Sequence, residues 1–192
     1  MKTLFTALAL TMMTIAGAAA LPALAQLPAG MELGPKIGAK VPDFAVVATS
    51  GEKLSRAALT GRSGVTLVFF RSADWCPFCK LQLKDLNSVA DELAALGWPM
   101  VGISYDPAET LTAFSTANGL KYPLTTDPDS KAIDAFGIRN ETVKGSARFD
   151  GIPHPIILFI GKDGTVKAKL YEEAYQKRPP SGLVLETARG LK

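Results

Sequence analysis

The stretch VTLVFFRSADWCPFCK, residues 65–80, decides the fold. Its first six residues are mostly β-branched, aliphatic or aromatic, which is the composition of a buried strand. A short polar turn follows, and a helical pattern begins at Pro77, which suits the first helical position because its missing N–H needs no partner there. The two cysteines of the chain, Cys76 and Cys79, both lie at this junction. The stretch therefore predicts a strand, a turn that carries a thiol, and a helix.

A thiol at the start of a helix favours its thiolate form. Unpaired backbone N–H groups and the positive end of the helix dipole both stabilise negative charge there, and the thiolate is the species that attacks. Arg71 and Lys80 are close enough in sequence to act in the same direction, whereas Asp74 acts against it. We expect Cys76 to be an exposed nucleophile. Cys79, one turn along, is expected to be the partner with which it opens and closes a disulfide.

The first 25 residues have the pattern of a secretory signal peptide. Lys2 supplies a positive charge, residues 4–20 are apolar and uncharged, and Ala23-Leu24-Ala25 fits the cleavage motif. The apolar stretch is close to membrane-spanning length, so an anchor is the alternative, but Pro22 and the cleavage motif favour removal. We expect an exported protein, periplasmic or secreted, with no stable membrane insertion after cleavage.

Length and composition predict one domain after this leader. Residues 26–40 are punctuated by Pro and Gly and predict an extended arm, and residues 41–192 are long enough to bury a sizeable core. The formal net charge of +3 is spread without a basic stripe, which argues against nucleic-acid binding. Two cysteines cannot build a disulfide framework, so the core must hold the fold, and export would place the pair where oxidation is the default.

Apolar periodicity along the domain alternates between strands and helices. Strands are expected at residues 44–48, 65–70, 100–104, 122–125, 155–160 and 166–171. Helices are expected at residues 77–96, 107–118, 129–136 and 183–189, with one helical turn at 55–59 and an irregular stretch at 138–154. This order predicts an α/β domain with a central mixed β-sheet and helices on both faces. Its strand–CxxC–helix unit is the thioredoxin-like signature.

Three segments carry a resemblance to a known family. They are Pro42-Asp43-Phe44, the WCPFC motif at residues 75–79 and the sequence ILFIGKDG at residues 157–164. Together they resemble the redoxin branch of the thioredoxin superfamily, which groups AhpC/TSA (peroxiredoxin-like) domains with exported thioredoxin-like reductases. The resemblance implies a thioredoxin-like fold behind an N-terminal extension. It also implies protein substrates that bear thiols or disulfides, a thiol electron donor, and no cofactor beyond a redox-active disulfide.

The resemblance assigns roles to individual residues. Cys76 matches the attacking thiol, Cys79 the resolving thiol, and Trp75 the indole beside them. Pro155 matches a proline that is cis in these folds and packs against the cysteine pair.

Three further residues are expected to support the site. Pro77 and Phe78 lie between the cysteines, where they help to set the reduction potential. His154 is expected to shape the substrate groove or to tune Cys76.

Two departures from the family pattern bear on the chemistry. Peroxiredoxins carry Pro and Thr seven and three residues before the attacking cysteine, where this chain has Phe69 and Ala73. Peroxide would therefore lose a hydrogen-bond partner. Thioredoxins carry a buried acid six residues before that cysteine, where this chain has Phe70. A proton taken from Cys79 therefore needs another acceptor.

Three functions are compatible with these residues. The first is thiol–disulfide exchange, in which Cys76 attacks a disulfide and Cys79 displaces the product. The alternative is an antioxidant peroxidase, in which Cys76 becomes a sulfenic acid that condenses with Cys79. A copper-delivery site of Cys76, Cys79 and His154 is the third, and no resident metal is expected. The chain has no GxGxxG or P-loop motif, so reducing power is expected to come from another protein's thiols.

Overall fold

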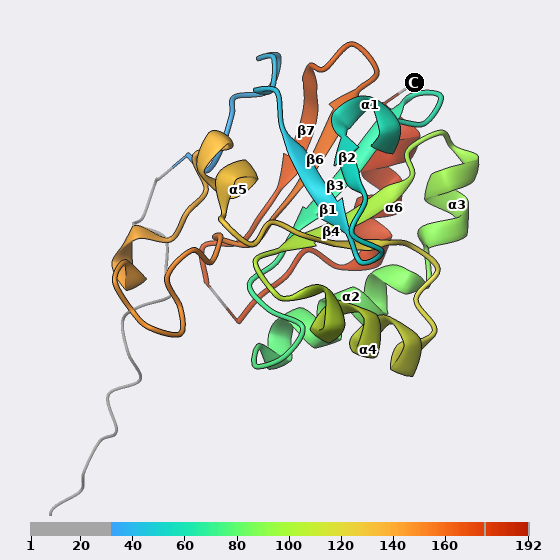
Figure 1. The fold of residues 1–192 in the computed structure, drawn as a ribbon. Helices are drawn as coiled ribbons and strands as arrows, with labels where there is room; N and C mark the ends of the chain where they lie inside the picture. Colours follow the sequence, from blue (N-terminus) through green and yellow to red (C-terminus); the bar gives the residue numbers. More distant parts are fainter. Residues whose placement is uncertain (1–31, 175, 192) are drawn as a thin grey trace, which may run out of the picture.

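Strand β3, Gly64–Phe69, lies in the interior of the β-sheet, and all six of its residues are buried. It pairs in parallel with β4, Met100–Ser104, and antiparallel with β6, Ile156–Gly161. The computed structural model describes residues 32–174 and 176–191, and Figure 1 shows the sheet with helices packed against it. The predicted leader, residues 1–25, and residues 26–31 of the predicted arm lie outside the described residues.

Seven strands form one mixed sheet in the order β2-β1-β5-β4-β3-β6-β7. The remaining strands are β1 Ala45–Ala48, β2 Lys53–Ser55, β5 Leu124–Thr126 and β7 Val166–Leu170. The helices are α1 Arg56–Leu59, α2 Pro77–Asn87, α3 Ala90–Ala95, α4 Ala108–Asn118, α5 Lys131–Ala135 and α6 Ser181–Gly190, with a 3-10 turn η1 at Glu141–Val143. The predicted α/β class and thioredoxin-like architecture are confirmed. The edge strand β2 was missed because three residues are too few to show a period.

The core has two parts because side chains alternate across the central strands. Val68 of β3 and Phe159 of β6 face a cluster formed with α2, α3, α4 and α6. Leu67 of β3 and Leu158 of β6 face the opposite cluster, which α1 and α5 cover. Helices therefore cover both faces, as predicted, and both interior strands read as nearly continuous apolar runs.

The single helix predicted at residues 77–96 is two helices. The break lies at Ser88 and Val89, where Val89 leaves the helical region with φ −111° and ψ 1°. The Ser88 hydroxyl donates to the Asp85 carbonyl, a local bond that competes with helix continuation. Asn87 also ties this end to the loop after α4, because its amide donates to the Gly119 carbonyl. Apolar periodicity missed the break because both helices face the same cluster.

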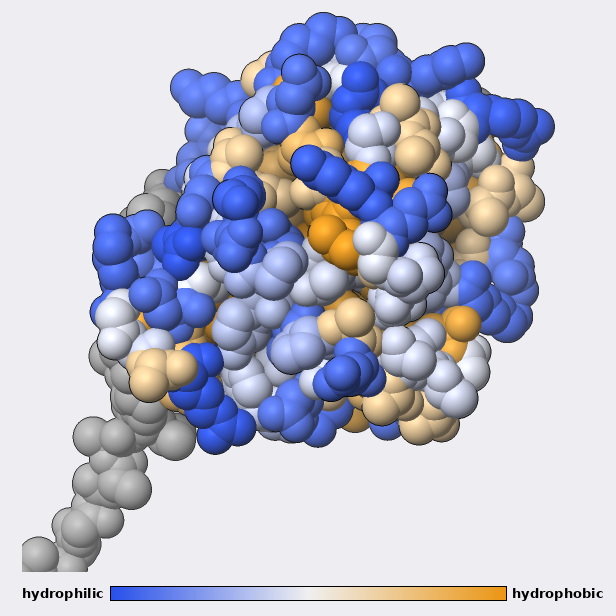
Figure 2. Space-filling model, viewed as in Figure 1, coloured by the Kyte–Doolittle hydropathy of each residue, from blue (hydrophilic) through white to orange (hydrophobic). Residues whose placement is uncertain are grey.

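The described part of the predicted arm lies against the β6–β7 hairpin. The N–H of Gly38 donates to the carbonyl of Val166 at 2.8 Å, and Lys40 pairs with Thr165. Leu33 is buried. Residues 32–174 and 176–191 include no helix long and apolar enough to cross a membrane. The face seen in Figure 2 is mostly polar, with apolar side chains in small separate patches.

Candidate active site

Cys76 is the N-cap residue of α2, at the junction where the sequence predicts it. The N–H of Cys79 points at the Cys76 sulfur, with 3.2 Å between N and Sγ, and Pro77 occupies the first turn. Cys76 and Cys79 form a disulfide, and their Cα atoms are 5.3 Å apart. That separation is within the range of about 4.4–6.8 Å that disulfides allow. The sulfur of Cys76 therefore lies where the helix start stabilises negative charge.

Both sulfurs are buried, which makes the prediction of an exposed Cys76 wrong. Cys76 and Cys79 are each 0% exposed and belong to the core cluster that also contains Ala73 and Leu83. A helix start is solvent-facing only when no other segment covers it. Here arginines from two other segments lie against the sulfurs.

Arg71 is the second residue after β3 and lies beside Cys76. Its Nη2 is 3.9 Å from the Cys76 Sγ, and its guanidinium lies 5.3 Å from the centre of the Trp75 ring. The predicted action of Arg71 on Cys76 therefore has a geometric basis. Lys80 instead donates from its ammonium to the Asp74 carbonyl.

Arg178 lies beside the other sulfur, and the sequence did not reveal it. It belongs to the segment between β7 and α6, and its Nη2 is 3.6 Å from the Cys79 Sγ. Burial, and then the positive charge of Arg71, lower the pKa of Arg178 to about 10, so it stays charged at neutral pH. Arg178 reads as a solvated residue beside Lys177 in the sequence, but only Lys177 is exposed.

A buried carboxylate holds the turn in front of Cys76. Asp106 is 3% exposed and accepts hydrogen bonds from the Ala73 N–H at 2.7 Å, the Ser72 hydroxyl at 2.8 Å and the Ser104 hydroxyl at 3.1 Å. Burial raises the pKa of Asp106, while these donors act against the rise. The Ser72 oxygen in turn accepts from the Asp74 N–H at 2.9 Å. The sequence suggested only a helix start at Asp106, so this anchoring contact was missed.

Trp75 is fixed by residues distant in sequence. Its indole N–H donates to the Tyr105 hydroxyl at 3.0 Å, and that hydroxyl donates to the Arg148 carbonyl at 2.8 Å. The Phe149 ring meets the Trp75 ring edge-on at 4.8 Å. The stretch 138–154, which has no periodicity in the sequence, therefore supplies one wall beside the cysteine pair.

His154 and Pro155 come directly before β6. His154 is 8% exposed, and its backbone N–H donates to the Ile138 carbonyl at 2.7 Å. Burial, and then the charge of Arg71, lower the pKa of its imidazole. The expected roles of His154, shaping the substrate groove or tuning Cys76, stay predictions. The His154–Pro155 peptide is trans, so the prediction of a cis bond is wrong; trans is the ordinary preference of X–Pro bonds by about 0.5–1 kcal/mol.

The described part of the chain offers no set of side chains that could bind a metal ion. Within residues 32–174 and 176–191, no group of three or more His, Cys, Asp or Glu side chains is placed to hold a metal ion. The copper site considered for Cys76, Cys79 and His154 is therefore not formed in this structure.

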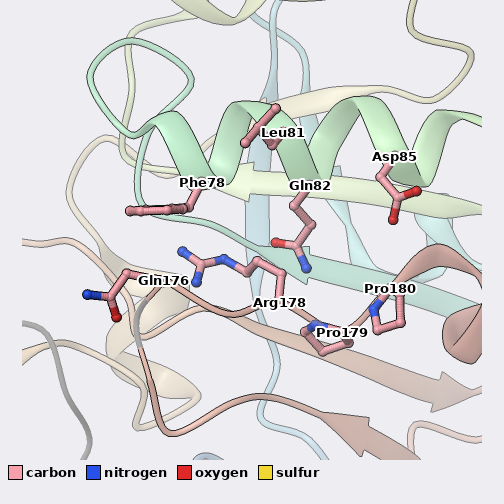
Figure 3. A pocket seen from close by; sticks show the side chains of 8 residues that line it. All are labelled: Phe78, Leu81, Gln82, Asp85, Gln176, Arg178, Pro179 and Pro180. Carbon is pink, nitrogen blue, oxygen red and sulfur yellow. The ribbon is translucent and has the colours of Figure 1, made fainter.

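A groove of about 220 Å³ lies between α2 and the segment before α6 (Figure 3). Its lining residues are Phe78, Leu81, Gln82, Asp85, Gln176, Arg178, Pro179 and Pro180. Figure 3 shows the Arg178 side chain extending along the groove toward Phe78. Phe78, predicted as a groove residue, lines this surface, and Pro77 is exposed at the start of α2.

The two departures from the family pattern lie in the core. Phe69 and Phe70 are both 0% exposed and point into opposite clusters. Ala73 is buried and offers no hydroxyl, while its N–H is taken by Asp106. The neighbouring Ser72 hydroxyl also donates to Asp106.

Comparisons with known proteins agree with this geometry. The AhpC/TSA family model matches residues 37–169. Peroxiredoxin Bcp of Escherichia coli K12 is 30% identical over 132 residues, which are 69% of this chain and 83% of that protein. The thiol-disulfide oxidoreductase ResA of Bacillus thuringiensis is 26% identical over 139 residues, 72% of this chain and 71% of that protein.

Solved structures share the fold. The crystal structure of peroxidoxin BcpB from Mycobacterium tuberculosis superposes with a TM-score of 0.69 at 22% identity, covering 84% of this chain and 99% of that one. Because the identity is only 22%, this match supports the shared fold alone. The family match, the similarity to peroxiredoxin Bcp and the cysteine pair at the helix start show that the chain belongs to the AhpC/TSA family, in the redoxin branch of the thioredoxin superfamily, and that it is a thiol-dependent oxidoreductase.

Proposed function

We propose that the protein is a thiol–disulfide oxidoreductase that cycles Cys76 and Cys79 between disulfide and dithiol. The observation that carries this proposal is that both sulfurs lie within one helical turn and are already bonded. Helix α2 is formed with the disulfide closed, since Cys76 is its N-cap and Cys79 lies in its first turn. Its partners would be protein or small thiol substrates that bear thiols or disulfides, and a thiol electron donor.

The exchange proceeds through a mixed disulfide. The Cys76 thiolate attacks one sulfur of a substrate disulfide, and the other substrate sulfur leaves as a thiolate. Cys79 then attacks the Cys76 sulfur, which releases the second substrate thiol and closes the Cys76–Cys79 disulfide. A donor dithiol, or two donor monothiols, regenerates the Cys76–Cys79 dithiol by the same steps in reverse and leaves as a disulfide. The Cys79 N–H at 3.2 Å from the Cys76 sulfur stabilises the attacking thiolate.

Peroxidase activity is the second candidate, and the similarity to peroxiredoxin Bcp favours it. Cys76 would attack the hydroperoxide, forming a sulfenic acid and releasing water or an alcohol, and Cys79 would condense with it and release water. Ala73 counts against this function because it supplies no hydroxyl to the peroxide. The Ser72 hydroxyl is not a ready substitute, since it donates to the carboxylate of Asp106 at 2.8 Å.

Export is part of the proposal, on the strength of the leader pattern at residues 1–25. Outside the cytoplasm oxidation is the default, so the donor thiol sets how much of the protein is reduced.

Stopped-flow Trp fluorescence separates the two candidate activities. The reduced protein is mixed with oxidised glutathione or with hydrogen peroxide, and Trp75→Phe identifies the signal that comes from the active-site indole. We expect the disulfide to react faster than it does with a free cysteine thiol, and the peroxide to react no faster than it does with one. A peroxide rate far above that of a free thiol would replace the first proposal with the peroxidase.

A further inference from the structure

The resolving cysteine has a cationic partner from a distant part of the chain. Arg178 and Cys79 are 99 positions apart, yet 3.6 Å separates Nη2 from Sγ. We infer that Arg178 holds Cys79 as a thiolate when the pair is reduced. This inference deepens the proposed function, because it assigns the residue that prepares the second thiol for its attack.

The position of Cys79 alone does not favour a thiolate. Cys79 lies inside the first turn of α2 and is 0% exposed within an apolar cluster. Burial in such surroundings disfavours charge and raises the pKa of a thiol. A guanidinium in contact lowers the pKa of the thiol, because the guanidinium is charged at neutral pH and water screens its attraction to the buried sulfur only weakly. Arg178 is therefore the group that decides the balance.

Among the described residues, the carboxylates Asp106 and Asp85 already accept other hydrogen bonds, so neither is a ready acceptor for the Cys79 proton. Phe70 occupies the place of the buried acid that thioredoxins carry, and Asp106 accepts from three donors of the turn. Asp85 lines the groove beside Arg178, but its two oxygens accept from the N–H and hydroxyl of Ser181, each at 2.8 Å.

Among the described residues, other charged or titratable groups near the cysteine pair include Arg71, His154 and Cys76 itself, which carries no charge while it is part of a mixed disulfide. Arg71 lies at Cys76. Burial and the charge of Arg71 lower the pKa of His154, which keeps the imidazole neutral at pH 7. The positive charge that faces Cys79 therefore comes from Arg178.

A thiolate at Cys79 removes one proton transfer from the cycle. In exchange, the Cys79 sulfur forms its bond to the Cys76 sulfur as the substrate–Cys76 bond breaks, and the substrate leaves as a thiolate that solvent protonates. In the peroxidase reaction hydroxide would leave the Cys76 sulfenic acid and take its proton from solvent. In both cases Cys79 has no proton to give up at the moment of attack.

The test measures the titration of Cys79 in the reduced full-length protein. Cys76→Ser isolates Cys79 and keeps a good N-cap residue on α2. The rate of iodoacetamide alkylation is followed by mass spectrometry from pH 5 to pH 10. We expect a midpoint at or below neutral pH, against about 8.5 for an ordinary thiol, because only such a midpoint leaves Cys79 largely a thiolate at neutral pH.

Variants at position 178 give the second measurement in the same background. Arg178→Gln is expected to raise the midpoint by about one pH unit or more, which slows alkylation about tenfold at pH values well below both midpoints. Arg178→Lys is expected to restore part of the shift, which a merely structural role would not do. The exposed neighbour provides the matched control, and Lys177→Gln should leave the midpoint unchanged.

Two results would overturn the inference. One is a Cys79 midpoint above neutral pH, which needs no variant at position 178 and so does not depend on its folding. The other is an unchanged midpoint in Arg178→Gln with native near-ultraviolet circular dichroism. Neither result depends on which substrate the enzyme uses, so failure of the proposed function would be seen separately, as absence of reaction with oxidised glutathione.

Discussion

The two sulfurs of the active site are surrounded in different ways. The surroundings of Cys76 are largely local: Arg71 is five positions away, the Cys79 N–H is three positions away, and the turn between them is held by Asp106. Cys79 instead receives its cation from Arg178, 99 positions along the chain. One redox pair thus depends on two structural supports, a local turn and a distant segment.

The charges of the two neighbouring cysteines are therefore controlled by different parts of the chain. The helix start and Arg71 act on the attacking sulfur, while the linker between β7 and α6 acts on the resolving sulfur. Each support is anchored by its own carboxylate: buried Asp106 on the Cys76 side and exposed Asp85 on the Arg178 side. Substitutions can therefore disturb one support and leave the other in place.

The largest expected effect separates the roles of the two cysteines. Cys76→Ser should abolish reaction with oxidised glutathione, because the attacking thiolate is gone. Cys79→Ser should react once and remain as a mixed disulfide that carries one glutathione, because the displacing thiol is gone. Intact-mass spectrometry with and without a reductant detects this adduct. Equal, small losses of activity in both variants would contradict the assignment of attacking and resolving thiols.

The next effect compares the two anchoring carboxylates. Asp106→Ala removes the acceptor of three buried donors, and we expect the free energy of unfolding to fall by about 3 kcal/mol, since each buried donor left unpaired costs roughly 1–3 kcal/mol. Asp85→Ala is the matched substitution at an exposed site, with an expected loss of about 1 kcal/mol or less.

Urea denaturation followed by circular dichroism measures both losses. Asp106→Asn, which keeps an acceptor oxygen, should fall between wild type and Asp106→Ala. If Asp85→Ala lowered the free energy of unfolding more than Asp106→Ala does, the turn before Cys76 would be the less strongly anchored of the two supports.

The smallest expected effect is on the pH dependence of folding stability, and it comes from His154 on the Cys76 side. Burial and Arg71 lower the pKa of His154, so the folded protein favours the neutral imidazole. This preference contributes to the free energy of unfolding. The contribution is fully present above the unfolded-state pKa of His154, about 6.5, and is lost as pH falls through its folded-state pKa. His154→Gln should therefore lose less stability than wild type between pH 7.5 and pH 5.

Arg71→Gln is the matched variant for this test, because it keeps His154 but removes the positive charge beside it. It should show an intermediate dependence on pH in urea denaturation at several pH values. Identical pH dependence in wild type and both variants would show that His154 does not sense its burial or Arg71.

Local patterns were sufficient for most of the fold. Strand β3 is an apolar run that ends at the cysteine turn, and the β6–β7 hairpin is marked by a Lys-Asp-Gly turn between two apolar stretches. These features depend on side chains within a few positions of each other. The break at Ser88 and Val89 was missed because it depends on Asn87 binding a loop 32 positions away.

By itself, the sequence determined the fold class, the CxxC pair and the placement of Cys76 at the start of a helix. These follow from residue type and spacing, because a helix start stabilises a thiolate wherever the helix lies. Only the tertiary structure decided that both sulfurs are buried, that Arg178 lies against Cys79 and that Asp106 holds the turn. The reason is physical: burial and charge depend on every group in contact, and those groups come from segments that no local pattern connects.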